Sequence, residues 1–271
     1  MSSHPLPVGP RTTLWQALAI QSRVVGAMIL RELHTRYGRD NVGYLWLFGE
    51  PMMLASVIGL IHLSAGHTAY GSDVQPVAFG VMAYTLFIQF RGIVNRSEGG
   101  LEANQALLYH RQVTIFDITL ARALLEFAGV FTTYCILMTL LIMIGYGSLP
   151  ARPLPFIGAW LLMFWYSIGH AFLITAVSYH NHTVGRFVHP YSYFMVALSG
   201  AYTPLGWMPP FIRTLLSYVP MTSIFELARY GQFESFNLDY FYPRYIIGAC
   251  LILTWVGLVQ MRAMRNRIHL S

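Results

Sequence analysis

Three histidines that lie close together have a spacing that could bind a metal ion. His180, His182 and His189 fall within the stretch YHNHTVGRFVHP, residues 179–190. Protein zinc sites usually combine histidine with cysteine or carboxylate ligands, and this stretch contains neither. The pattern therefore favours polar residues of a short loop over a metal site, and we expect no bound metal.

Motifs for catalysis and nucleotide binding are absent from the sequence. It contains neither GxSxG nor HExxH, the signatures of serine hydrolases and zinc proteases. All 17 basic residues are arginine, so the GxxxxGK[ST] lysine of a nucleotide-binding loop is missing. We expect a chain that is not an enzyme and has no cofactor of its own, with ATP and magnesium bound by a partner subunit. An intramembrane enzyme is the less favoured alternative.

Ionisable residues inside apolar runs are a stronger functional signal, because charge is costly in lipid and is usually retained for function. Glu50, Arg91 and Glu126 lie in such runs. Arg91 either extends to the membrane surface or faces a cavity, where it would bind a phosphate or carboxylate. Glu126 can pair with Arg122, four residues earlier on the same helix face. Glu50 precedes Pro51 and predicts a local break beside a substrate path.

The composition indicates that most of the chain is surrounded by lipid. Its 271 residues are 55% hydrophobic and only 10% charged, with a mean hydropathy of +0.50. A soluble domain carries about 25% charged residues. The net charge of +6 comes from arginines that flank apolar segments, which argues against nucleic-acid binding. Cys135 and Cys250 both lie in apolar runs, so no disulfide framework is expected.

Six apolar runs are long enough to cross about 30 Å of hydrocarbon. We therefore predict an all-α integral membrane protein with six transmembrane helices, in a single transmembrane domain over residues 1–271 and without a cleavable signal peptide. The predicted spans are residues 44–63, 76–94, 123–145, 156–177, 187–203 and 245–261.

Two other segments predict helices that do not cross the membrane. Residues 14–41 have apolar side chains mainly on one side, which predicts an amphipathic helix on the membrane surface. Residues 204–243 contain several prolines, and their two helical pieces are too short to span. We predict a re-entrant hairpin of half-helices, in which Ser223 and Glu226 form a capping box for the second piece.

The arginines are distributed unequally between the two sides that six spans create. One side holds Arg11, Arg23, Arg31, Arg36, Arg39, Arg96, Arg111, Arg122, Arg186, Arg262, Arg265 and Arg267, whereas the other holds Arg152, Arg213, Arg229 and Arg244. Since arginine-rich loops remain inside, we predict that both termini and the loop of residues 95–117 are cytoplasmic.

Three stretches together resemble the membrane subunit of ABC-2 type exporters and, within that family, the KpsM-like permeases of capsular polysaccharide export. They are RELHTRYGRDNVGYLWLFGEP (31–51), LEANQALLYHRQVTIFDITLARALLE (101–126) and YTPLGWMPPFIRTLLSYVPMTSIFELAR (202–229). They occur in the family's order and spacing, and the resemblance covers essentially the whole chain. It implies the fold of a type V exporter, with an interface helix before the first span and re-entrant periplasmic half-helices before the last.

The resemblance also implies a function. The chain would be the permease of an ATP-driven exporter that moves lipid-linked anionic capsular polysaccharide across the inner membrane of a Gram-negative bacterium. Two copies would pair as a homodimer with two ABC ATPase subunits, and further partners would be a periplasmic co-polymerase and outer-membrane export proteins. An ABC-2 exporter of O-antigen, teichoic acid or a drug is the alternative.

Two groups of residues are expected to carry this function. The coupling group, which would contact the ATPase, is Glu102, Asn104, Gln105 and Arg111. The group at the substrate entrance and path is Arg31, Tyr37, Arg39, Tyr44, Trp46, Glu50, Tyr84, Phe87 and Arg91. Basic residues at an entrance raise the local concentration of an anionic substrate, and aromatic rings pack against the apolar faces of sugars.

Overall fold

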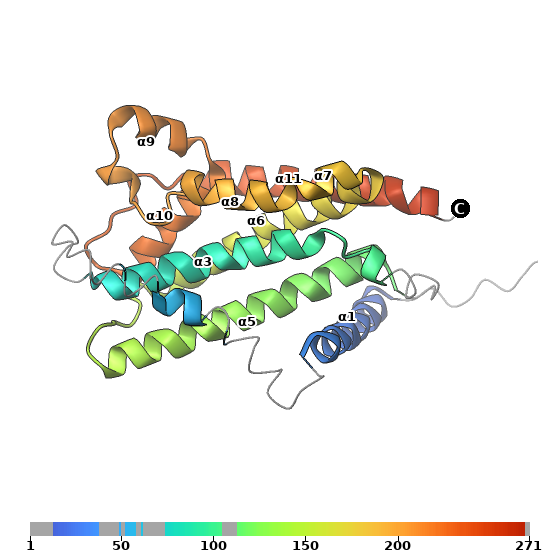
Figure 1. The fold of residues 1–271 in the computed structure, drawn as a ribbon, viewed down its shortest axis with the longest axis horizontal. Helices are drawn as coiled ribbons and strands as arrows, with labels where there is room; N and C mark the ends of the chain where they lie inside the picture. Colours follow the sequence, from blue (N-terminus) through green and yellow to red (C-terminus); the bar gives the residue numbers. More distant parts are fainter. Residues whose placement is uncertain are drawn as a thin grey trace, which may run out of the picture.

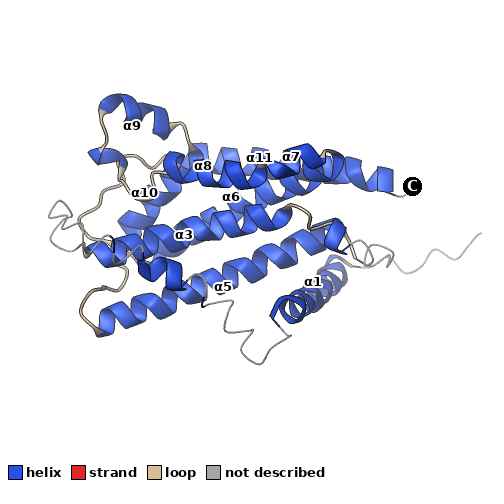
Figure 2. Ribbon diagram, viewed as in Figure 1, coloured by secondary structure: helices blue, strands red, loops and turns tan. Residues whose placement is uncertain are grey.

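Every regular element among the described residues is a helix (Figure 2), which confirms the all-α prediction for this part of the chain. The computed structural model describes residues 13–37, 49, 52–57, 61, 74–104 and 113–268. Its long helices are α1 (Leu14–Tyr37), α3 (Pro76–Ser97), α5 (Ile115–Met143), α6 (Pro153–His180) and α11 (Pro243–Ile268). Its shorter elements are η1 (Glu102–Asn104), α7 (His182–Arg186), α8 (Val188–Leu198), η2 (Leu205–Trp207), α9 (Pro210–Ser217) and α10 (Pro220–Gln232).

Four of the described helices, α3, α5, α6 and α11, are long and apolar enough to cross a membrane. They coincide with four of the six predicted spans. The predicted span 44–63 lies mostly outside the described residues. The predicted span 187–203 is wrong at its end, because α8 stops at Leu198 and Gly200 follows with a left-handed φ of 62°. With 11 residues, α8 alone covers only about 16 Å.

The helices begin where the sequence supplies residues that suit a helix start. α3, α6, α9 and α10 carry a proline in their first positions, where a missing N–H has no cost. α5 begins differently, with a capping box. The Thr114 N–H donates to Asp117 Oδ2 at 2.9 Å, and the Asp117 N–H donates to Thr114 Oγ1 at 3.3 Å. This cap extends α5 several residues before the predicted span.

The core is built around α6, which contacts α3, α5, α10 and α11. Trp160 of α6 is 1% exposed and lies against Phe131 and Tyr134 of α5. α11 approaches α6 closely at Gly257, where an added Cβ would lie 2.7 Å from Phe172 Cβ. Small residues of this kind allow helices in lipid to pack at short distance.

The two ends of the bundle differ (Figure 1). At one end, called the α1 end, α1 lies beside the beginning of α5, and the C-terminus of α11 emerges there. Val25 and Met28 of α1 are buried against Ile118 and Ala121 of α5, while Trp15 remains 83% exposed. An amphipathic helix was predicted for residues 14–41, and α1 confirms a helix over most of that range.

At the opposite end, called the α9 end, the short helices α9 and α10 follow one another (Figure 1). The two predicted helical pieces in 204–243 are therefore present. The predicted capping box at Ser223 is wrong, because α10 already begins at Pro220 and its N-cap residue Val219 makes no side-chain cap. Ser223 consequently lies within the helix, where it is fully buried.

Candidate functional site

A hydrogen bond at the α1 end joins the two predicted groups of functional residues. The Arg31 guanidinium of α1 donates to Asn104 Oδ1 at 2.8 Å. Asn104, at the end of η1, is 4% exposed, and its own amide donates to the Gly100 carbonyl at 2.9 Å. A predicted entrance residue thus holds a predicted coupling residue in place.

The start of α5 also contacts α1. Gln21 of α1 donates a hydrogen bond to Asp117, the carboxylate of the α5 capping box. Asp117 is 2% exposed. The segment between η1 and α5 is therefore attached to α1 through Asn104 before it and through Asp117 after it.

Two ion pairs lie next to these hydrogen bonds. Arg122 of α5 pairs with Glu32 of α1 at 3.0 Å, and Arg96 of α3 pairs with Glu126 of α5 at 2.5 Å. Gly92 leaves the space that Glu126 occupies, since an added Cβ would overlap its carboxylate. We call the eight residues Gln21, Arg31, Glu32, Arg96, Asn104, Asp117, Arg122 and Glu126 the polar joint.

The polar joint is suited to transmitting force rather than to chemistry. Two of its acids pair with two of its bases, and its remaining charged residues, Arg31 and Asp117, are hydrogen-bonded to neutral side chains. Hydrogen bonds and ion pairs in a half-buried site are directional, so a displacement of one segment moves the others. Glu102, the first residue of η1, is exposed beside the joint, whereas Gln105 and Arg111 lie outside the described residues.

The predicted entrance and path residues do not all come together. Tyr37 is the last residue of α1, and Arg39, Tyr44, Trp46 and Glu50 lie outside the described residues. Tyr84 and Phe87 are 8% and 2% exposed, so both pack inside the chain rather than on a surface. Their assignment to the path, like that of the whole group, stays a prediction.

Arg91 lies half-buried on α3 and stacks on an aromatic ring of α8. Its Cζ is 3.9 Å from the centroid of the Tyr193 ring, and Tyr193 is itself 58% exposed. A guanidinium over a tyrosine face is attracted by the ring quadrupole. The contact orients Arg91 toward the surface formed by α3 and α8, which is compatible with either predicted role.

Of the three histidines in this segment, His189 has a described side chain, and those of His180 and His182 lie outside the described part. The imidazole Nε2 of His189 lies 3.5 Å from Glu98 Oε2, at the end of α3. Asn181 caps α7 by accepting a hydrogen bond from the Thr183 N–H at 2.9 Å. Both contacts agree with polar residues of a short connection between helices.

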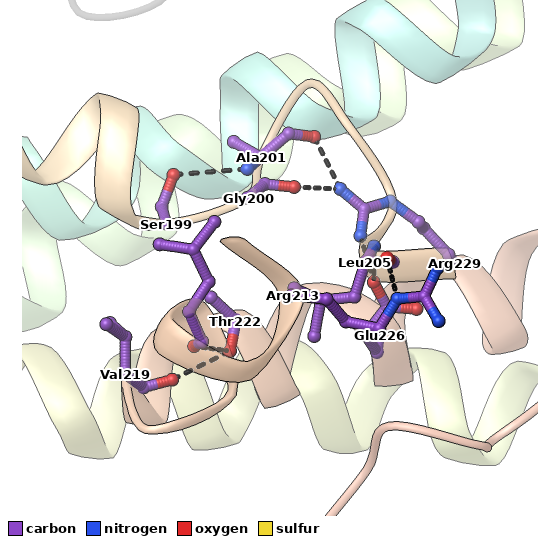
Figure 3. Close-up of polar contacts among 10 residues, drawn as sticks. Ser199, Gly200, Ala201, Leu205, Arg213, Val219, Thr222, Glu226 and Arg229 are labelled. Atoms are coloured by element: carbon purple, nitrogen blue, oxygen red, sulfur yellow. Dashed lines mark hydrogen bonds and ion pairs between the residues drawn. The ribbon is translucent and has the colours of Figure 1, made fainter. Parts of the chain in front are cut away.

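A buried ion pair at the α9 end was missed by the sequence analysis (Figure 3). Arg229 and Glu226 of α10 are 1% and 3% exposed and lie 2.8 Å apart. Arg229 also donates to the carbonyls of Gly200 and Ala201, and Glu226 accepts from the Leu205 N–H at 3.0 Å. The available signal was an acid and a base three residues apart in a short helix with apolar neighbours.

Arg213 and Arg152 serve the same end of the molecule by binding backbone carbonyls. Arg213 donates to the carbonyls of Leu205, Gly206 and Met208 at 2.9–3.0 Å. Arg152 donates to the carbonyls of Tyr230 and Phe233 and stacks over the Tyr230 ring at 4.1 Å. The planar guanidinium, with five donors, is suited to such multiple contacts.

Comparison with known proteins matches most of this chain. The ABC-2 type transporter family model matches residues 23–233. The capsule polysaccharide export inner-membrane protein CtrC of Neisseria meningitidis serogroup B is 36% identical over 251 residues, 93% of this chain and 94% of CtrC. The capsule polysaccharide export inner-membrane protein BexB of Haemophilus influenzae is 32% identical over 254 residues, 94% of this chain and 96% of BexB.

A third relative is more distant and still aligns over most of its length. The polysialic acid transport protein KpsM of Escherichia coli is 27% identical over 244 residues, 90% of this chain and 94% of KpsM. Four apolar helices, the polar joint and the α9 end all fall within or next to the matched region. On this evidence, the chain is a multi-span membrane protein that belongs to the ABC-2 type transporter family.

Proposed function

We propose that this chain is the membrane-spanning permease of an ATP-driven exporter of lipid-linked capsular polysaccharide in the bacterial inner membrane. The observation that carries the proposal is the alignment, over more than nine tenths of each chain, with relatives that are named capsule polysaccharide export inner-membrane proteins. The resemblance in residues 101–126 supports the capsule branch over other ABC-2 substrates.

ATP hydrolysis belongs to a separate subunit in this proposal. The absence of lysine leaves this chain without a nucleotide-binding loop, so ATP and magnesium are bound by an ABC ATPase. Two copies of the permease pair with two copies of that ATPase. A periplasmic co-polymerase and outer-membrane export proteins continue the route outward.

The proposed topology places the α1 end in the cytoplasm together with both termini. α1 then lies on the membrane surface, and α9 and α10 form the re-entrant half-helices on the outer side. The two further spans of the proposed six are the segment around residues 44–63 and α7 together with α8, residues 182–198. The excess of arginine at the α1 end supports this orientation.

The polar joint gives the proposal a mechanism. The ATPase contacts the loop at the predicted coupling residues Glu102, Gln105 and Arg111, while the buried Asn104 and Asp117 connect the loop to α1. A movement of the loop therefore reaches α1 and α5 together, and through Arg96 it reaches α3. Arg31, Tyr37 and Arg39 are then close to the moving part, where they attract the anionic substrate.

Two experiments test the proposal. Deletion of the gene should leave capsular polysaccharide inside the cell, and a plasmid copy should restore surface capsule; an unchanged capsule would overturn the substrate assignment. Affinity purification of the tagged full chain in mild detergent should recover an ATPase that contains a nucleotide-binding loop. A stable assembly without any such subunit would remove the exporter mechanism itself and favour an intramembrane enzyme.

A further inference from the structure

A cavity with a volume of about 240 Å³ lies at the α9 end, between η2 and the segment that follows α10. Three aromatic side chains line it, those of Trp207, Phe236 and Tyr240. Polar lining comes from Asn237, Asp239 and Glu226. The combination of ring faces with carboxylate and amide groups is absent from the polar joint, so this is a second and chemically different site.

The walls of the cavity are fixed by contacts with other elements. Arg213 holds the η2 wall through its hydrogen bonds to the carbonyls of Leu205 and Gly206, both at 3.0 Å. Phe236 stacks on Phe79 of α3 with a centroid distance of 6.4 Å, and Trp207 lies 6.5 Å from Phe236. A binding site with walls that are already in place loses little entropy when a ligand enters.

The charge of the cavity is acidic. Glu226 is compensated by Arg229 at 2.8 Å and by the Leu205 N–H, whereas Asp239 is exposed to solvent. None of the described lining residues is basic. Arg213, whose Cζ lies 5.7 Å from the centroid of the Tyr240 ring, is engaged by three backbone carbonyls. A ligand carboxylate would therefore meet Asp239 directly, and like charges at close range repel.

These observations select a ligand class. Aromatic faces pack against the apolar CH faces of sugar rings, and carboxylate oxygens accept hydrogen bonds from hydroxyl groups. The volume is below the range of about 300–1,000 Å³ that is typical of drug-sized ligands, so one ring fits and an oligosaccharide does not. We propose that this cavity binds one neutral, hydroxyl-rich sugar ring and discriminates against uronic acids.

The location gives the site a role that rests on the proposed function. The cavity lies at the α9 end, opposite the α1 end (Figure 1), so in the proposed orientation it faces the outer side of the membrane. A neutral sugar ring of the exported polysaccharide would bind in the cavity after that ring has crossed the membrane. The site would then act as an outer holding point that opposes return of the chain to the cytoplasm.

The test measures binding directly, with the full chain in lipid nanodiscs together with its ATPase where the two co-purify. Saturation-transfer NMR with methyl β-glucopyranoside should show transfer to the CH protons of the ring, and methyl β-glucuronide should show several-fold less. Gly206→Leu should abolish the signal, because a Cβ at Gly206 points toward Tyr240, 3.8 Å from Cε2. Trp207→Ala should weaken binding roughly threefold to tenfold, the value of one aromatic contact.

Two further variants complete the design. Trp255→Ala, at a tryptophan of α11 that is 68% exposed, should leave binding unchanged. Asp239→Asn should retain glucoside binding and raise the signal of the glucuronide. Absent transfer, equal transfer for both glycosides, or equal transfer for all variants that retain the parent unfolding temperature would overturn the proposal. Capsule production in the deletion strain tests the proposed function separately. An absence of glycoside binding would therefore overturn the cavity proposal and leave the proposed export function standing.

Discussion

At the scale of single residues, the features that matter most are polar side chains held by one another rather than by water. Asn104 has both ends of its amide engaged, one by Arg31 and the other by Gly100. Arg229 is almost completely buried and binds a carboxylate and two carbonyls. Loss of Arg31 would leave the buried Asn104 oxygen without that donor, and loss of Arg229 would leave the buried Glu226 without its cation, and both changes are costly.

Replacement of Arg31 or Asn104 by alanine should uncouple the two activities of the assembly. We expect surface capsule to fall several-fold while ATP hydrolysis by the purified complex continues, because one of the two contacts between the loop and α1 is lost. The double variant should resemble each single variant, because all three variants remove the same hydrogen bond between Arg31 and Asn104. The coupling energy of two such residues in contact is about 0.5–3 kcal/mol. Arg23→Ala is the control, because the hydrogen bond of Arg23 among the described residues stays within α1, to the Ala19 carbonyl at 3.1 Å. Additive losses in the double variant would contradict a shared contact.

Arg229→Met should destabilise the chain by about 3–5 kcal/mol, the usual cost of removing one partner from a buried ion pair. The measurement is thermal unfolding of the purified chain in detergent, supported by its yield in membranes. Arg244→Met, at an exposed arginine near the start of α11, should unfold at the parent temperature. Glu226→Gln combined with Arg229→Met should recover part of the loss, and identical unfolding of the Arg229 and Arg244 variants would disprove the assignment.

At the scale of helices, the close approach of α11 to α6 depends on glycine. An added Cβ at Gly257 would lie 2.7 Å from Phe172 Cβ and 3.1 Å from the Leu173 nitrogen, whereas one at Gly248 would meet nothing within 4 Å. The same helix therefore contains a crowded glycine and an open one. Alanine changes the helix propensity equally at both positions, so a comparison of the two substitutions isolates the effect of helix packing.

Gly257→Ala should lower stability by about 1–3 kcal/mol, as overpacking of an interior contact generally does. Gly248→Ala, in the same helix, should have no such cost. Unfolding of both variants in detergent, compared with the parent chain, provides the measurement. Equal stabilities of the two variants would show that α11 and α6 are farther apart than described.

The helices also show how far a single sequence can predict such a molecule. α3, α6 and α11 were predictable because their apolar runs are long, and length decides whether a helix can span. The early start of α5 depends on Thr114 and Asp117, which lie before its apolar run. The end of α8 depends on the left-handed φ at Gly200, and hydropathy does not report either feature.

The site was predictable only in part, for a physical reason. The sequence drew attention to Arg31 and Asn104 separately, but their contact spans 73 residues and depends on how α1 packs. The pairing of Arg96 with Glu126 likewise requires that α3 and α5 lie side by side. Charges near one another in the sequence can be paired by helix periodicity, whereas pairs between helices require the packed structure.

At the scale of the whole molecule, the difference between the two ends is the main result. The α1 end contains the polar joint, and the α9 end contains the buried ion pair of Arg229 with Glu226 and an aromatic cavity. The proposed orientation assigns these ends to opposite sides of the membrane. This arrangement separates the part that receives force from the part that meets the emerging sugar chain.

Cysteine labelling should test that orientation. In a background with Cys135→Ala and Cys250→Ala, we expect Asn237→Cys to react with a membrane-impermeant maleimide in intact spheroplasts. Thr13→Cys should react only after the membrane is opened. Both positions are exposed; Thr13 immediately precedes α1, and Asn237 lies in the segment that follows α10. The reverse pattern of labelling would invert the proposed topology.

The contacts of the arginines at the α9 end also have a consequence for how the protein is made. The hydrogen bonds of Arg213 join residues that are only 5 to 8 positions apart in the sequence. The hydrogen bonds from Arg229 to Gly200 and Ala201 join residues that are 29 and 28 positions apart. Contacts between residues near in sequence form first, so residues 200–229 can take their shape as soon as the ribosome has supplied them. Arg152, the N-cap residue of α6, binds the Tyr230 carbonyl and lies 78 residues earlier in the chain, so it has already been synthesised by then. The α9 end can thus be assembled before α11 has left the ribosome completely, so the last helix inserts against a surface that is already formed.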